Sequence, residues 1–210
     1  MTEATNVLHA ERETPDFAAR YPNLANARLG AEVISVTDEF FAERSRLINP
    51  DEAVFYPDLY DDHGKWMDGW ESRRRRSGGN DYALIKLGGP TVVRAINIDT
   101  AFFTGNFPHA ARLMGAYHEG EGMPAETRYR TLVDMSKLGP DAAHWFEVSH
   151  AEPVTHLRLD MYPDGGIARL RVHGIPVPEP TTDETSIVEL SSILNGGRVL
   201  AFNDSHYGNP

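Results

Sequence analysis

The segment 156–173 constrains the fold of this chain most, because it alternates apolar and polar residues on both sides of a turn. Every second residue of 157–161 is apolar, the turn Pro163-Asp164-Gly165-Gly166 follows, and every second residue of 168–172 is apolar again. A period of two is typical of antiparallel strands that cover a core with one face. We therefore predict two antiparallel strands connected by this turn, each with one face on the core, and Arg169 and Arg171 on an exposed face.

Shorter strand patterns, separated by turn residues, recur through the chain. They predict a strand that starts at Gly30, strands over 82–87 and 91–99 joined as a hairpin by Gly88-Gly89-Pro90, and a strand over 145–148. The segment 110–119 fits either a helix or a strand. Short strands with turns between them predict an all-β fold, an antiparallel jelly-roll β-sandwich of the galactose-binding (discoidin-like) kind with few short helices.

The composition along the chain predicts four segments. Residues 1–29 are an N-terminal arm with a short helix over 11–19, and 30–174 are the jelly-roll body. Residues 175–194 begin with closely spaced prolines and are expected to be a linker with a short helix over 187–194. In 195–210 the pattern of 32–41 returns, with Asp204 in the place of Asp38. A returning pattern indicates a second repeat, so we predict that 195–210 is its truncated first strand.

Composition excludes several classes of protein. The chain has no cysteine, which excludes disulfides, thiolate catalysis and Cys-ligated zinc. A formal net charge of −11 argues against a nucleic-acid partner. The first 20 residues contain no apolar signal-peptide core, and no window approaches about 18 consecutive apolar residues. We therefore expect a cytoplasmic protein with no membrane partner.

Against this acidic background, the stretch 65–76 is cationic and rich in tryptophan. It reads Lys-Trp-Met-Asp-Gly-Trp-Glu-Ser-Arg-Arg-Arg-Arg, and its Asp-Gly step favours a turn. Guanidinium forks, carboxylates and indole walls around a turn suit a small, planar, anionic ligand. The candidate ligand-binding residues here are Lys65, Trp66, Trp70, Arg73, Arg74 and Arg75. The alternative is that both indoles anchor the core and the arginines form a solvated surface.

Three long motifs carry a resemblance to a known family. They are the stretch 65–76, Ile98-Asp99-Thr100-Ala101-Phe102-Phe103-Thr104-Gly105-Asn106, and Tyr162-Pro163-Asp164-Gly165-Gly166-Ile167-Ala168-Arg169-Leu170-Arg171-Val172. In this order they resemble the allantoicase family (allantoate amidinohydrolases), from about Asn23 to Gly174 and again from Asn195. The resemblance implies two tandem jelly-roll repeats and hydrolysis of allantoate to ureidoglycolate and urea in purine (allantoin) degradation. The sequence differs from the family pattern in one respect: it contains no second copy of the stretch 65–76, which a second repeat would be expected to carry.

With allantoate as the implied small-molecule substrate, the polar residues receive candidate roles. Arginine suits the substrate carboxylate, and two carboxylates with separated pKa values can deliver a proton to the departing urea and activate water. The candidate catalytic residues are Asp68, Glu71 and Asp99, and the turn after Asp99 adds Thr104 and Asn106 as substrate-binding candidates. Each has a structural alternative, because Asp68 can simply shape its turn, Glu71 can neutralise an arginine, and Thr and Asn are ordinary turn residues.

No metal or cofactor is predicted. The nine histidines show neither His-x-x-x-His nor His-Glu-x-x-His spacing, although strands can bring scattered histidines together, so a catalytic divalent metal stays open. Two other functional classes also stay open. One is a non-catalytic jelly-roll module that holds a small ligand or a sugar at the tryptophan-lined turn. The other is a half-enzyme that needs a second repeat and therefore associates, for which we expect a homo-oligomer.

Overall fold

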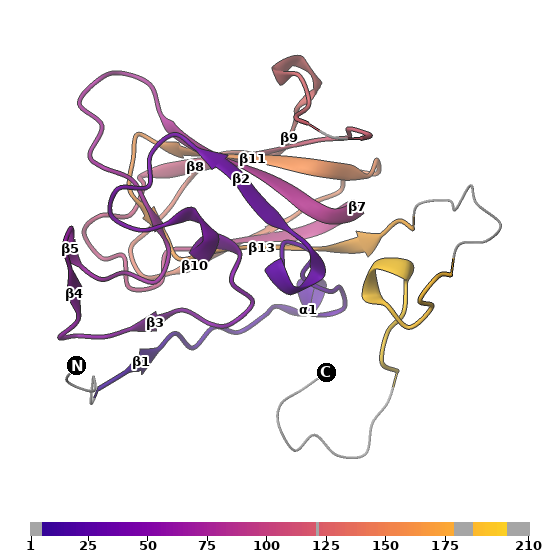
Figure 1. Ribbon diagram of the computed structural model, residues 1–210, viewed down its shortest axis with the longest axis horizontal. Helices are drawn as coiled ribbons and strands as arrows, with labels where there is room; N and C mark the ends of the chain where they lie inside the picture. The colour runs from indigo at the N-terminus through magenta and orange to yellow at the C-terminus, as the bar shows by residue number, and fades with distance from the viewer. Residues whose placement is uncertain (1–5, 121, 179–186, 201–210) are drawn as a thin grey trace.

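A computed structural model describes residues 6–120, 122–178 and 187–200 (Figure 1). Most of their regular structure is strand, which confirms the predicted all-β class. The strands are β1 (Leu8–His9), β2 (Glu32–Val36), β3 (Val54–Phe55), β4 (Tyr60–Asp61), β5 (Gly64–Lys65), β6 (Trp70–Glu71), β7 (Asp81–Asp99), β8 (Ala110–Ala116), β9 (Arg130–Lys137), β10 (Ala143–Glu147), β11 (Val154–Tyr162), β12 (Gly166–Ile167) and β13 (Arg169–Pro176). The helices are α1 (Asp16–Ala19) and the 3-10 turns η1 (Ala27–Leu29), η2 (Arg44–Ile48), η3 (Glu126–Arg128) and η4 (Ile193–Asn195).

One long strand, β7, belongs to both layers of the sandwich. Its first half, up to Lys86, pairs antiparallel with β2 on one side and β11 on the other, and β8 and β9 extend this layer. Its second half, from Thr91, pairs with β13 and β10 in the second layer. Strands that change sheet at a bend form the corners of such sandwiches. The segment 110–119, which the sequence left open, is therefore strand β8.

The predicted hairpin at Gly88-Gly89-Pro90 is wrong, because β7 runs through these residues without a turn. Gly88 instead allows the backbone of η1 to lie close to β7, because a Cβ atom on Gly88 would collide with the carbonyl oxygen of Leu29. Pro90, which has no N–H to donate, lies between the two paired halves of the strand, where the ladder changes partners. The Gly-Gly-Pro pattern therefore marks the corner between the layers.

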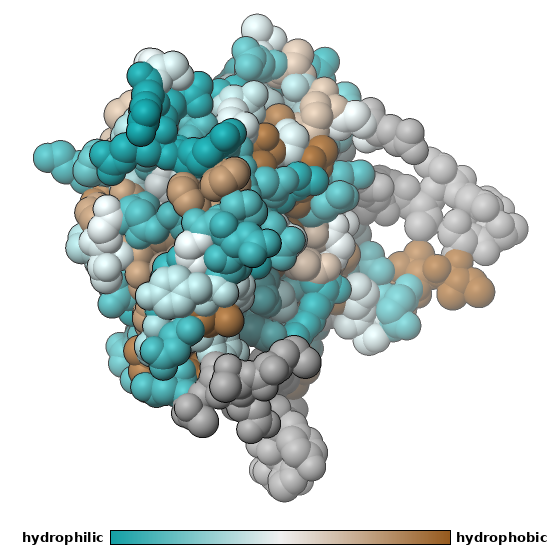
Figure 2. Space-filling model, turned by 60° about the vertical axis from the view of Figure 1, so that its left-hand side comes forward, coloured by the Kyte–Doolittle hydropathy of each residue, from teal (hydrophilic) through white to brown (hydrophobic). Residues whose placement is uncertain are grey.

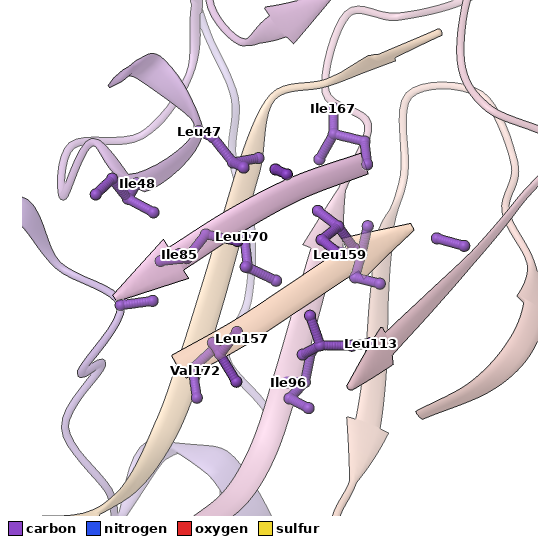
Figure 3. Close-up of a cluster of buried hydrophobic side chains, with 14 of the residues drawn as sticks. Leu47, Ile48, Ile85, Ile96, Leu113, Leu157, Leu159, Ile167, Leu170 and Val172 are labelled. Carbon is purple, nitrogen blue, oxygen red and sulfur yellow. The ribbon is translucent and has the colours of Figure 1, made fainter. Parts of the chain in front are cut away.

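The hydrophobic core fills the space between the two layers (Figure 3). The apolar residues of β11 and β13 point into it as their period-two pattern predicts; Leu157, Leu159, Leu170 and Val172 are almost completely buried. The opposite faces differ from prediction. Arg169 is fully buried and Arg171 is largely buried, because the loop 46–54 covers that face of β13 and accepts hydrogen bonds from both side chains.

Both predicted short helices are shorter in the structure than expected. In the segment 11–19 only α1 is helical, because Pro15 fixes an extended backbone at its start (φ −66°, ψ 152°) and disfavours helix in the residue before it. In the segment 187–194 the helical part is the turn η4, which Gly196 ends at a positive φ of 87°. Strand β13 continues to Pro176, and the returning pattern of 198–207 lies outside the described residues from 201 onward.

The surface is largely hydrophilic on the face shown in Figure 2, where apolar atoms lie in small separate groups. The most exposed large apolar side chains belong to the C-terminal segment, with Ile187 at 99% and Leu200 at 90% exposure. Among the helices of the described ranges, none has the length and apolarity needed to cross a bilayer.

Candidate active site

A polar cleft lies where the β7–β8 loop, the β11–β12 turn and strand β6 meet. It consists of two adjoining cavities of about 270 and 300 Å³ that share Phe41, Glu71 and Asn106. The other residues of the first cavity are Ser72, Arg74, Arg75, Gly105, Phe107, His109, Pro163, Asp164 and Gly165. Those of the second are Phe55, His63, Lys65, Met67, Phe102 and Thr104. Six predicted site residues therefore meet in one cleft: Lys65, Glu71, Arg74, Arg75, Thr104 and Asn106.

Glu71 stands between the two cavities because of its place in β6. Its neighbour Trp70 points into the core, and the period of two turns Glu71 the other way. Main-chain hydrogen bonds to Ala42 on one side and pairing with Gly166 of β12 on the other fix the strand. The Nδ2 atom of Asn106 donates a hydrogen bond of 2.6 Å to Oε1 of Glu71. The carboxyl group is thus held rigidly at the middle of the cleft.

Burial raises the pKa of Glu71 above its ordinary value. The hydrogen bond from Asn106 acts in the opposite direction, and the negative charge of Asp61 raises the pKa further. A carboxyl group of this kind keeps its proton to higher pH than a solvated glutamate and can therefore act as a general acid. The arrangement resembles the general case in which a poorly solvated carboxyl serves as the proton donor.

The four arginines divide into two alternate pairs. Arg73 forms an ion pair of 2.6 Å with Asp38, and Arg75 forms one of 2.6 Å with Asp81. Arg74 and Arg76 are exposed and form no ion pair within the described residues. Since Arg74 lines the cavity that contains Glu71, it is the guanidinium placed to receive an anionic group there. Arg73, predicted to bind substrate, is instead committed to Asp38.

Lys65 lines the second cavity and packs against aromatic rings. Its ammonium group lies 4.3 Å from the ring centre of Tyr60 and 5.2 Å from that of Phe55, and it donates to the carbonyl oxygen of Pro57. His63 lines the same cavity and packs on Phe40. This cavity therefore has aromatic and cationic side chains beside the shared Glu71, whereas Asp164 and Arg74 line the first cavity.

The two tryptophans do not form walls of the cleft. Trp70 is fully buried and donates its indole N–H to the carbonyl oxygen of Asp38 at 2.8 Å, so the prediction that it contacts a ligand is wrong. Trp66 packs edge-on against Tyr56, with the guanidinium of Arg46 4.8 Å from its ring centre, and does not line either cavity. The alternative prediction, that the two indoles are structural anchors, therefore fits the structure better than the prediction that they contact a ligand.

Asp68 also lies away from the cleft. Its carboxylate forms an ion pair of 2.7 Å with the buried guanidinium of Arg169 and accepts the main-chain N–H of Val54 at 2.9 Å. These two bonds hold the Asp68-Gly69 turn against β13 and β3. Of the two carboxyl groups predicted from this stretch, Glu71 lines the cleft and Asp68 lines neither of its cavities.

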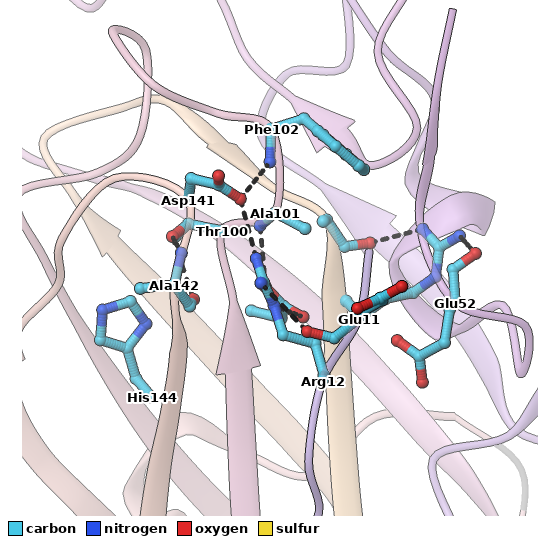
Figure 4. A network of polar contacts seen from close by, with 12 residues as sticks. Glu11, Arg12, Glu52, Thr100, Ala101, Phe102, Asp141, Ala142 and His144 are labelled. Carbon is cyan, nitrogen blue, oxygen red and sulfur yellow. Dashed lines mark hydrogen bonds and ion pairs between the residues drawn. The ribbon is translucent and has the colours of Figure 1, made fainter. Parts of the chain in front are cut away.

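Asp99 lies at another place on the same end of the sandwich. It accepts hydrogen bonds from Arg12 of the N-terminal arm at 3.2 Å and from the N–H of Ala101 at 2.8 Å. Arg12 also forms an ion pair with Asp141 (Figure 4). Burial raises the pKa of Asp99, while the charge of Arg12 lowers it. Asp99 thus ties the arm to β7, and neither cleft cavity includes it.

Several cleft residues were not singled out by sequence reasoning. Asp164 was assigned to turn chemistry, yet it lines the first cavity and accepts the main-chain N–H of Arg75 at 2.7 Å. His109, His63 and Phe41 also line the cleft. Of these four residues, Asp164 alone had a usable sequence signal, since it belongs to one of the three family-like motifs. Within the described ranges, no cluster of three or more His, Asp or Glu side chains is arranged to hold a metal ion.

Comparison with known proteins finds one family along most of the chain. Residues 22–177 match the family described as the allantoicase repeat. The chain is 50% identical over 196 residues to a probable allantoicase of Ralstonia nicotianae, covering 92% of this chain and 58% of that protein. It is 45% identical over 204 residues to one of Acinetobacter baumannii (strain ACICU), covering 97% and 60%. The crystal structure of allantoicase from Saccharomyces cerevisiae superposes with a TM-score of 0.75 at 34% identity, covering 90% of this chain and 57% of that chain. The chain therefore spans less than two thirds of the length of these relatives.

Proposed function

Because this chain belongs to the allantoicase family, we propose that the protein hydrolyses allantoate to ureidoglycolate and urea, and that the Glu71 cleft carries the reaction. Allantoate has one carbon that bears a carboxylate and two ureido groups. Hydrolysis breaks one C–N bond of this carbon, transfers a proton to the departing ureido nitrogen, and adds the hydroxyl group of water to the carbon. The site must therefore hold the carboxylate and deliver that proton.

The observation that carries the proposal is that a buried carboxyl group and an unpaired guanidinium line the same cavity. Arg74 binds the substrate carboxylate, and Glu71, whose pKa is raised by burial, donates the proton to the leaving urea. Asn106 keeps the Glu71 side chain in place through its 2.6 Å hydrogen bond. Asp164, the other carboxylate of this cavity, is the group we assign to the attacking water.

The second cavity receives the remaining ureido group. Its polar side chains include Thr104 and Lys65, and aromatic rings of Phe41, Phe55 and Phe102 border it. A planar ureido group can stack on such rings while its N–H and C=O groups bond to the polar side chains. The two-part shape of the cleft thus corresponds to the two arms of allantoate on either side of its reacting carbon.

The test is urea release from allantoate by the purified 210-residue chain, measured with added divalent metal and with a chelator. We expect turnover by the parent chain and by Glu147→Gln, whose glutamate is exposed at the end of β10, and none by Glu71→Gln. Turnover that persists in Glu71→Gln would contradict the proposal.

The half-enzyme alternative is favoured by one observation, the 58–60% of the relatives' length that this chain spans. In that case the folded chain binds allantoate, as calorimetry would show, and releases urea only together with the remaining part of a full-length relative. Self-association of this chain stays a prediction, which light scattering would test.

A further inference from the structure

A cavity of about 500 Å³ lies at the opposite ends of β8 and β11 from the Glu71 cleft. Its polar side chains are Lys86 of β7, His118 after β8, Thr155 and His156 of β11, and Asn195 of η4. No aspartate or glutamate of the described chain lines it. The proposed allantoate chemistry uses none of these residues.

Three groups that carry or can acquire positive charge face this cavity together. His156 and Lys86 are directly opposite each other in the antiparallel register, so their side chains lie on one face of the sheet. The rings of His118 and His156 have centroids 5.8 Å apart. Glu32 is opposite Lys86 on its other side, in β2, but it does not line the cavity. The nearby Glu119 bonds to the hydroxyl of Tyr117.

His156 is held in one orientation and leaves one ring nitrogen unsatisfied. It is only 1% exposed, and its Nδ1 lies 2.9 Å from the hydroxyl of Thr155. That hydroxyl accepts the N–H of His118 at 2.9 Å and lies 3.1 Å from the His118 carbonyl oxygen. In the imidazolium form, Nδ1–H donates to Thr155, the Thr155 hydroxyl donates to the carbonyl, and Nε2–H needs an acceptor. Nε2 is buried and bonds to no atom of the described residues.

A buried polar atom without a partner calls for a ligand or a water molecule. Burial lowers the pKa of His156, and the positive charges of His118 and Lys86 lower it further. An anion would reverse the effect of those charges and would supply the acceptor that Nε2–H lacks. A cation would add to the same repulsion.

We propose that this cavity is a binding site for a small oxyanion, which accepts from Nε2–H of His156 and pairs with the ammonium group of Lys86. The exposed Lys86 side chain is free to close over the anion, whereas His156 is fixed in the sheet. The site is separate from the Glu71 cleft, so the proposal holds whether or not the chain hydrolyses allantoate.

The test follows the ring nitrogens and protons of His156 by NMR in a pH titration of the 210-residue chain, without and with inorganic phosphate, and in a second arm with acetate. We expect phosphate to raise the pKa of His156. We expect Lys86→Gln to weaken phosphate binding about tenfold, as for the loss of one charge-assisted hydrogen bond. A response to acetate as well would assign the site to oxyanions generally, and a response to phosphate alone would assign it to the tetrahedral anion.

The matched control is Lys137→Gln, which makes the same charge change at an exposed end of β9 and should leave phosphate binding unchanged. Arg74→Gln removes the guanidinium of the other cleft and should leave the His156 response intact. The proposal is overturned if phosphate leaves the His156 titration unchanged, if Lys137→Gln weakens binding as much as Lys86→Gln, or if His156 responds to Zn²⁺ but not to phosphate.

Discussion

The guanidinium of Arg169 lies 2.7 Å from the carboxylate of Asp68, and both side chains are buried. Arg169 also donates to the carbonyl oxygens of Arg46, Asp51 and Asp68, so one side chain joins β13, the loop 46–54 and the turn before β6. These contacts of Arg169 support strand β6, which carries Glu71, and Arg169 itself does not line the cleft. The family-like motifs therefore contain a structural ion pair beside the proposed catalytic group.

Asp68→Asn should destabilise the protein and leave its activity in place. The amide leaves the buried Arg169 charge uncompensated, for which we expect a loss of about 3 kcal/mol or more in the free energy of unfolding. Urea denaturation would measure it. The control is Asp51→Asn, which breaks the exposed Arg28–Asp51 pair and should cost less than about 1 kcal/mol. Lost turnover with unchanged stability would return Asp68 to the catalytic role expected from the sequence.

Glu71→Gln should change how stability depends on pH. Because burial raises the pKa of Glu71, the contribution of its protonated form is fully present below the unfolded-state pKa, and it is lost as pH rises through the folded-state pKa. Glutamine keeps the acceptor for Asn106 and does not ionise. We therefore expect the variant to equal the parent in acid and to be at least as stable near neutral pH.

Denaturation curves between about pH 4 and pH 8 would test this, since they start near the ordinary glutamate pKa of about 4.3. The exposed Glu147→Gln should follow the parent chain throughout. A Glu71→Gln variant that loses stability at neutral pH would show that the ionised carboxylate supports the fold, and would contradict a raised pKa.

If the Glu71 cleft binds allantoate as proposed, Arg74→Gln should weaken that binding about tenfold or more, because it removes the proposed charge-assisted bond to the allantoate carboxylate. Arg76→Gln makes the same change two residues along, at a position that does not line the Glu71 cavities. We expect it to bind like the parent, and calorimetric titration with allantoate would compare them. Because both arginines are exposed and unpaired in the described structure, neither change should move the thermal midpoint by much. Equal losses of affinity would indicate a diffuse charge effect.

Gly69→Ala should destabilise the protein, whereas Gly105→Ala should not. A Cβ on Gly69 would lie 2.6 Å from the carbonyl oxygen of Ile167 and 2.7 Å from the Cα of Ala168, so the backbone must move. Overpacking of this kind costs about 1–3 kcal/mol. A Cβ on Gly105 would meet no atom within 4 Å. Thermal midpoints of the two variants would decide whether Gly69 is needed for this close approach or only for its turn.

Prediction from sequence succeeded where the signal is local. The alternation in β11 and β13 depends on neighbouring residues, and it identified both strands and their core faces. It failed at Gly88-Gly89-Pro90, because a turn and a corner between layers use the same residue types and differ only in which strands lie alongside. It failed again at Arg169, whose burial depends on a loop more than a hundred positions earlier.

The sequence by itself determined the all-β class, the family, and six of the residues that line the cleft. Only the tertiary structure decided their roles. Asp68, Glu71 and Asp99 are alike as carboxylates, but Arg169 pairs with Asp68 and Arg12 pairs with Asp99. Among the described residues, the carboxyl group of Glu71 has only the neutral Asn106 side chain as a hydrogen-bond partner. Desolvation and ion pairing depend on segments far apart in the chain, so no local pattern reveals which carboxyl group keeps a raised pKa in the cleft.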